Sequence, residues 1–123
     1  MEDLEKIFKA LADNNRLRIL KLLEKKAMCV CELAFVLEIA QPSVSRHLKK
    51  LRAAGLVEDR QAGFWSNYVL ASARTGKRGY AQALMARLRS WLNDDRRVLG
   101  DQTRARRADR NALCRSVAAG SSR

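Results

Sequence analysis

The chain has 123 residues, a length typical of a single domain, and 47% of them are hydrophobic, which is enough for a packed core and excludes a chain disordered throughout. Twenty-five Lys and Arg residues against 13 Asp and Glu give a formal net charge of +12, which favours a polyanion, most simply nucleic acid, as the partner. No apolar run approaches the roughly 20 residues of a membrane span, so no membrane partner is expected. The N-terminus lacks the apolar core of a signal peptide, and three cysteines do not form a closed disulfide framework, so a cytoplasmic setting is expected.

Three helices are predicted in the first third of the chain. Apolar residues recur at helical spacing over about 4–12, and the polar segment 13–15 ends that helix and can cap the next one. The second helix covers about 17–26, where the two final lysines suit the negative end of the helix dipole. A short third helix is expected over about 30–38.

A fourth helix, from residue 41 to about 53, has the pattern of a DNA-recognition helix. Pro42 suits its first turn, and Gly55 suits a left-handed cap just beyond its end. Val44, Leu48 and Leu51 recur at helical intervals and are expected to point inward. The outward side is then polar and basic. A helix, a short turn at 39–40 and a second helix with such a face predict a helix-turn-helix.

The remaining segments predict a hairpin, a helix and a tail. Segments 56–60 and 64–70 have partial period-two character around a Gly-containing turn, which is typical of a wing. A linker over 71–77 precedes a helix expected from about Tyr80 to Leu99. The predicted fold is therefore mainly α with a small β-hairpin, a winged helix-turn-helix over residues 1–99. Residues 100–123 are expected to be a basic, weakly helical or disordered tail.

Candidate DNA contacts follow from position on the recognition helix and the wing. Side chains near the N-terminal part of such a helix reach base edges, and later lysines and arginines contact phosphates, which position rather than specify. Residues expected at base edges are Gln41, Ser43, Ser45 and Arg46; those expected at phosphates are Lys49, Lys50 and Arg52; Arg60 and the wing tip with Trp65 could reach the backbone or the minor groove. His47, the only histidine, is predicted to be a packing or phosphate-contact residue rather than a metal ligand.

The pair Cys29 and Cys31 lies ten residues before the recognition helix. Buried cysteines often act as small hydrophobic residues, but a pair two residues apart on a helix faces in directions about 200° apart, so both are not expected in one core. Thiolates select soft ions, and the available Cys and His do not cluster for tetrahedral zinc. Because sulfurs on opposite faces of an intact helix cannot converge, ligand binding is expected to distort the start of the third helix.

Five segments carry a family resemblance. They are Leu11-Ala12-Asp13, Arg16-Leu17-Arg18-Ile19-Leu20, Cys29-Val30-Cys31-Glu32-Leu33, Gln41-Pro42-Ser43-Val44-Ser45-Arg46-His47-Leu48-Lys49 and Ala54-Gly55-Leu56-Val57. On these residues the chain resembles the ArsR/SmtB family of winged-helix repressors, and its arsenic-responsive branch in particular, over about residues 4–99. The resemblance implies a homodimer formed through the first and last helices, a palindromic double-stranded DNA operator, and As(III) as the inducer.

The chain departs from the family pattern at the thiol site. Members of the arsenic-responsive branch often have a third cysteine three residues after the second, where this chain has Ala34. Trivalent arsenic or antimony takes about three sulfurs, so a third donor is needed from elsewhere. Cys114, in the basic tail, is the candidate, although it could equally be an incidental tail cysteine.

Three functions are compatible with these patterns. The first is a repressor of an arsenic-resistance-type operon that releases its operator when As(III) or Sb(III) binds, with no cofactor required. The second keeps the same fold and responds to thiol oxidation or persulfide. The third is a ligand-independent basic DNA-binding or architectural module. An enzyme is not expected, because the chain has no nucleophile–base constellation and no phosphate-binding glycine loop.

Overall fold

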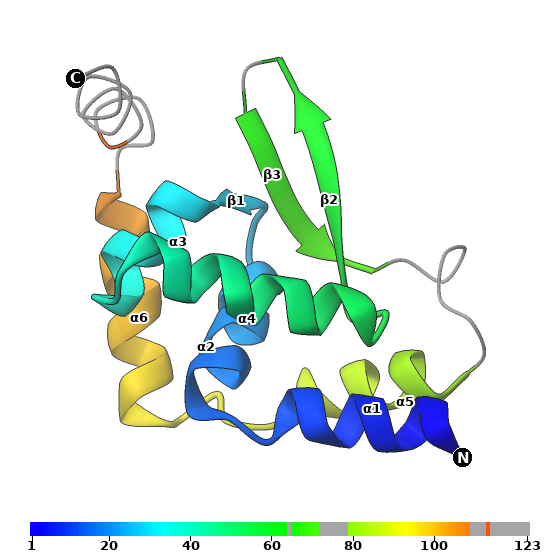
Figure 1. The fold of residues 1–123 in the computed structure, drawn as a ribbon. Helices are drawn as coiled ribbons and strands as arrows, with labels where there is room; N and C mark the ends of the chain where they lie inside the picture. The colour runs from blue at the N-terminus through cyan, green and yellow to red at the C-terminus, as the bar shows by residue number, and fades with distance from the viewer. Residues whose placement is uncertain (64, 72–78, 109–112, 114–123) are drawn as a thin grey trace.

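The computed structural model describes residues 1–63, 65–71, 79–108 and 113 (Figure 1). Within these residues it is mainly α-helical, with a small antiparallel sheet, which confirms the predicted fold class. Its elements are α1 (Glu2–Leu11), α2 (Asn14–Leu23), β1 (Met28–Cys29), α3 (Val30–Leu37), α4 (Gln41–Ala53), β2 (Val57–Ala62), β3 (Trp65–Leu70), α5 (Gly79–Leu88) and α6 (Arg96–Arg107). Among the described helices, none has the length and hydropathy needed to cross a lipid bilayer.

Local sequence signals set the limits of α2 and α4. Asp13, in extended conformation, caps α2 by accepting the backbone N–H of Arg16 at 3.1 Å. Pro42 lies in the first turn of α4, and Gly55 takes the predicted left-handed conformation with φ of 77°. The backbone N–H of Leu56 then donates to the carbonyl of Leu51 at 3.0 Å, which closes the end of the recognition helix.

Helices α2, α3 and α4 share the central core. Val44, Leu48 and Leu51 of α4 are fully buried, as predicted, and lie in one apolar cluster with Leu33 and Val36 of α3. Because the inward face of α4 is occupied in this way, its polar and basic face is directed outward. The packing between α3 and α4 is extensive, so the two helices of the helix-turn-helix are held against each other.

The sheet has one strand more than the predicted hairpin. Strands β2 and β3 pair antiparallel from Val57↔Leu70 to Ala62↔Trp65, with Gly63 in the turn at φ of 64°. The two-residue strand β1 pairs with the other edge of β3, so the strand order is β1-β3-β2. The segment that carries Cys29 is therefore paired with the middle of the wing strand β3.

The predicted helix over about 80–99 is two helices in the structure. Leu92, between them, has a φ of 65°, and Asp95 begins α6 by accepting the backbone N–H groups of Arg97 and Val98. The fully buried Lys21 donates to the carbonyl of Leu88 at 2.8 Å at the end of α5. A capping carboxylate and a cation from α2 thus favour the break, because they bind the backbone groups that a continuous helix would use itself.

Helix α6 crosses the boundary expected between residues 99 and 100. Asp101 is 1% exposed and accepts two hydrogen bonds from Arg18, both at 2.8 Å, and one from Arg104 at 2.7 Å. Arg104 also donates to the carbonyl of Val36 at 2.9 Å, near the end of α3. These contacts hold residues 100–107 against α2 and α3, in place of the flexible segment that the sequence suggested. The later tail, with Cys114, lies outside the described residues.

We predict that Asp101→Ala destabilises the fold by about 3 kcal/mol, because removing one partner of a buried charge network leaves the other charges uncompensated. The measurement is the free energy of unfolding in urea, followed by circular dichroism. The control is Asp94→Ala, which removes a carboxylate from an exposed position and is expected to change stability by less than about 0.5 kcal/mol. Equal effects of the two substitutions would contradict a structural role for the Asp101 network.

Candidate DNA-binding surface and thiol site

The outward face of α4 carries the residues predicted to contact DNA. Gln41, Ser43 and His47 are partly exposed; Ser45, Arg46, Lys49, Lys50 and Arg52 are exposed. Arg46 donates to Ser43 Oγ at 3.1 Å, one turn earlier on the same face. Within the described part of the chain, Lys49, Lys50 and Arg52 form no ion pair, so their charges are available to phosphates.

The wing supplies a second basic position. Arg60 in β2 is exposed and lies 3.5 Å from a carboxylate oxygen of Glu58 on the same strand. Trp65 is the first residue of β3, and its side chain lies outside what the structure describes. The structure therefore brings Arg60 onto the hairpin beyond α4, as the sequence suggested, and leaves the contribution of Trp65 a prediction.

His47 is held by a buried arginine that sequence analysis did not single out as a site residue. Arg16 is 8% exposed, and its guanidinium donates to the carbonyls of Ala10 and Lys9 at the end of α1. The same guanidinium lies 3.2 Å from His47 Nδ1. Because a guanidinium only donates hydrogen bonds, Nδ1 must accept, and the ring proton of the neutral imidazole is then on Nε2. His47 is thus oriented by a contact between α2 and α4.

Cys29 lies at the cap of α3 rather than inside it. It is 4% exposed and extended, with φ of −91° and ψ of 170°. Its backbone N–H donates to Glu32 Oε1 at 3.0 Å, and its thiol side chain accepts the backbone N–H of Glu32, which together form a capping box. The sequence contains this signal as Cys-x-x-Glu, a capping box with sulfur in place of the usual hydroxyl, and the sequence analysis missed it.

Cys31 is in the first turn of α3 and is partly exposed. The two thiols therefore differ in environment: one sulfur caps the helix from the β1 side, and the other is on the helix itself. This changes the expected geometry, because only Cys31 is within the helix and the angle of about 200° between helical neighbours does not describe the pair. An ion bound by the Cys29 sulfur would disrupt the capping box. It would not have to disrupt an intact helical turn that contains both cysteines.

In the part of the chain that the structure describes, no third donor lies near the pair. Within the described residues, no group of three or more His, Cys, Asp or Glu side chains is placed to hold a metal ion. Glu32, the nearest carboxylate in sequence, is buried and already bonded to the backbone of Cys29. Cys114 lies outside the described residues, so its assignment as a ligand stays a prediction.

Comparison with known proteins finds a matching family model and similar transcriptional regulators. Residues 13–59 match the model of the family described as bacterial regulatory protein, arsR family. The arsenic resistance transcriptional regulator ArsR1 of Pseudomonas putida is 48% identical over 65 residues, which cover 52% of this chain and 51% of that protein. The uncharacterized HTH-type transcriptional regulator MJ1325 of Methanocaldococcus jannaschii is 46% identical over 78 residues, which cover 60% of this chain and 88% of that protein.

A solved structure extends the likeness to the fold. The homodimeric winged helix-turn-helix DNA-binding domain of Mb0332 from Mycobacterium bovis, described as a possible ArsR-family regulator, is 28% identical with a TM-score of 0.61. The match covers 72% of this chain and 76% of that one. Fold, surface and relatives together define a winged helix-turn-helix domain of the kind found in transcriptional regulators. The chain belongs to the ArsR family, although it spans only about half of the Pseudomonas arsenic regulator.

The environment of His47 gives a pH prediction. Burial, the largest cause, lowers the pKa of His47 below its ordinary value of 6.5; Arg16, Lys50 and Arg46 lower it further, and Asp13 opposes them. The unfolded chain then takes up the proton before the folded one as pH falls, so the free energy of unfolding decreases below about pH 6.5.

The matched variant is His47→Gln, whose side-chain oxygen can accept the Arg16 hydrogen bond and does not titrate. We expect the wild type to lose more stability than this variant between pH 7.5 and 5.5, measured by urea unfolding at each pH. Parallel stability curves for the two proteins would contradict the prediction.

Proposed function

We propose that the protein is a homodimeric transcriptional repressor of an arsenic-resistance-type operon in the cytoplasm. In this proposal it binds a palindromic operator and releases it when As(III) or Sb(III) binds Cys29, Cys31 and Cys114. The observation that carries the proposal is the position of Cys29, where strand β1, the cap of α3 and the wing strand β3 meet. The similarity to the arsenic resistance regulator of Pseudomonas putida supports this choice of inducer.

In the DNA-bound state, the N-terminal half of α4 enters the major groove. Gln41, Ser43, Ser45 and Arg46 contact base edges there, since amide, hydroxyl and guanidinium groups can each pair with a base edge. Lys49, Lys50 and Arg52, together with His47, contact phosphates along the same helix. Arg60 and Trp65 place the wing on the neighbouring backbone or minor groove.

The capping box couples the Cys29 thiol to the DNA-contacting elements. When the Cys29 sulfur bonds to an ion, it must leave the backbone N–H of Glu32, and the start of α3 loses its cap. Cys29 also pairs with Asn67 in the middle of β3, so the same movement disturbs the wing. Because α3 packs on α4, both DNA-contacting elements are affected by one event. A ligand that binds this altered state more tightly shifts the population away from the DNA-bound state.

The end of α6 supports a role for the tail as third donor. Lys26, just before β1, donates to the carbonyl of Ala105 at 3.2 Å, and Arg104 contacts the end of α3. Helix α6 ends at Arg107, seven residues before Cys114, and seven residues span up to about 24 Å. In this proposal the Cys114 thiol uses that length of chain to reach the pair of its own subunit or of a partner.

The operator used in this test is the duplex that the wild-type protein selects from a random pool. Arsenite is expected to lower the affinity of the protein for this operator. We expect a decrease of about 5- to 150-fold, the usual range of coupling between two ligands, measured by fluorescence anisotropy. Cys29→Ser and Cys31→Ser should keep DNA affinity and lose the response; serine is also a favourable helix cap. X-ray absorption should count three sulfurs per arsenic in the wild type and two in Cys114→Ser.

Two results would contradict the proposal. Unchanged operator affinity in saturating arsenite would exclude arsenite as the inducer. Release by peroxide in metal-free buffer, with no response to arsenite, would assign the same thiols to redox sensing instead.

The dimer interface is proposed to lie on α1 and α5. Phe8 of α1 and Tyr80 of α5 are 54% and 51% exposed, and Figure 1 shows the two helices on the same side of the molecule. Large exposed apolar side chains on neighbouring helices favour association, and the similar Mycobacterium domain is homodimeric. A second copy packed through these helices would cover both.

Phe8→Glu is expected to shift the protein from dimer to monomer, because it places a charge in the apolar interface, and to weaken operator binding. Sedimentation equilibrium measures the first effect and anisotropy the second. The control is Phe35→Glu on α3, which also changes an exposed phenylalanine but lies outside the proposed interface. A dimer that persists in Phe8→Glu would place the interface elsewhere.

A further inference from the structure

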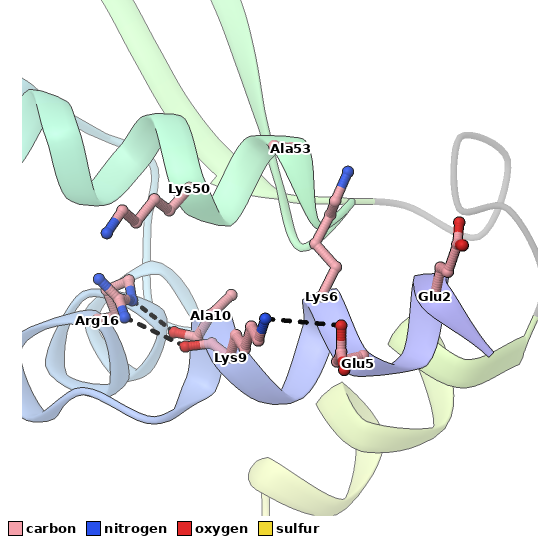
Figure 2. A pocket seen from close by; sticks show the side chains of 8 residues that line it. All are labelled: Glu2, Glu5, Lys6, Lys9, Ala10, Arg16, Lys50 and Ala53. Carbon is pink, nitrogen blue, oxygen red and sulfur yellow. Dashed lines mark hydrogen bonds and ion pairs between the residues drawn. The ribbon is translucent and has the colours of Figure 1, made fainter.

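A charged groove lies between α1 and the C-terminal half of α4 (Figure 2). It has a volume of about 600 Å³. Four cationic side chains line it, Lys6, Lys9, Arg16 and Lys50, against two carboxylates, Glu2 and Glu5. The groove is thus positive on balance, and one of its walls belongs to the recognition helix.

The floor of the groove is a buried positive charge. Arg16 donates to the carbonyl of Ala10 at 2.6 Å and to that of Lys9 at 3.2 Å, and its third contact is His47. Within the described residues it forms no ion pair with a carboxylate within 4.0 Å. Its hydrogen bonds are made, but its charge is not neutralised by an ion pair, so the groove favours an anion.

The lysines are arranged around this floor. Figure 2 shows Lys6 extending from α1 toward α4 and Lys50 directed from α4 toward Arg16. Neither forms an ion pair in the part of the chain that the structure describes. Lys9 is 3.6 Å from Glu5, an exposed pair that water screens strongly and that contributes little. Glu2 lies at the far end of the groove, so the positive end is the one next to the middle of α4.

The position of the groove indicates its occupant. Helix α1 and the wing lie on opposite sides of α4 (Figure 1). When a recognition helix enters the major groove, sugar–phosphate strands border it on both sides. The wing is placed for one of these strands, and the groove, with Lys50 on its wall, is continuous with the surface that faces the other.

We propose that this groove binds a phosphate diester of the DNA backbone, and that Lys6 and Lys9 of α1 are DNA contacts in addition to those on α4 and the wing. The inference rests on the proposed function, since it requires DNA bound to α4. Its ligand is a phosphate oxygen, which both lysines approach as point charges and which Arg16 attracts from below. Contacts of this kind add affinity without sequence preference.

The test compares Lys6→Gln and Lys9→Gln with the wild type, on the selected operator and on a scrambled duplex, between 50 and 200 mM salt. Each variant should bind both duplexes more weakly by the same factor, and the slope of log affinity against log salt should decrease by about 0.9 for one lost phosphate contact. The affinity ratio of wild type to variant should then fall about 3.5-fold over this salt range.

Two further variants provide controls. Lys25→Gln removes the same charge from an exposed position outside the groove and should leave the slope unchanged. Glu5→Gln removes a negative charge from the groove and should strengthen binding, which a merely structural role for the lysines would not produce. Sedimentation of each variant confirms that the oligomeric state is unchanged.

The outcomes separate the two proposals. If the wild type binds its operator but Lys6→Gln and Lys9→Gln have the slope of Lys25→Gln, the groove proposal is overturned and the proposed function stands. If the wild type prefers no duplex while the slopes still change, the groove is supported and the operator is not. If inorganic phosphate binds the wild type but not Lys6→Gln, while the two proteins bind DNA with equal affinity and equal salt slope, the occupant is a small anion and the groove proposal fails.

Discussion

The packing of α3 on α4 is the constraint on which the rest of the structure depends. Val44, Leu48 and Leu51 close the core from one side, and Leu33 and Val36 close it from the other. Protein cores at native density do not deform continuously, so a helix in such a contact shifts as a unit or not at all. The direction of the basic face of α4 is therefore set by the position of α3. Any group that alters the start of α3 acts on the DNA-binding surface through this contact.

Much of the fold could be predicted because its determinants are local. The spacing of Val44, Leu48 and Leu51 fixes which face of α4 is buried, whatever the rest of the chain does. Gly55 and Gly63 mark positive φ, which other residues rarely adopt, so the end of α4 and the turn of the hairpin follow from single residues. The outward position of the candidate DNA contacts is a consequence of the same periodicity.

The remaining features depend on contacts between distant parts of the chain. No sequence pattern near Asp101 indicates that Arg18, 83 residues earlier, binds its carboxylate. The charged segment that begins at residue 100 is therefore predicted as a tail. The pairing of Met28 with Tyr68 makes a strand from two residues that are too few to have a pattern. The contact of Arg16 with His47 likewise joins residues 31 apart, and it orients a histidine that the sequence predicted only as a packing or phosphate-contact residue.

Strand β1 has a mechanical consequence. Because β3 is the central strand, the hairpin is attached to the body of the protein near Cys29 and Asn67 and extends from there toward Gly63. Asn67 lies four residues from Gly63, so at about 3.3 Å per residue the hairpin is a lever of about 13 Å whose pivot lies beside a thiol. A rotation of about 10° at the pivot moves the tip by about 2.3 Å, enough to break a hydrogen bond made there. A small rearrangement at one sulfur is thus amplified, at the far end of the hairpin, into the loss of a contact.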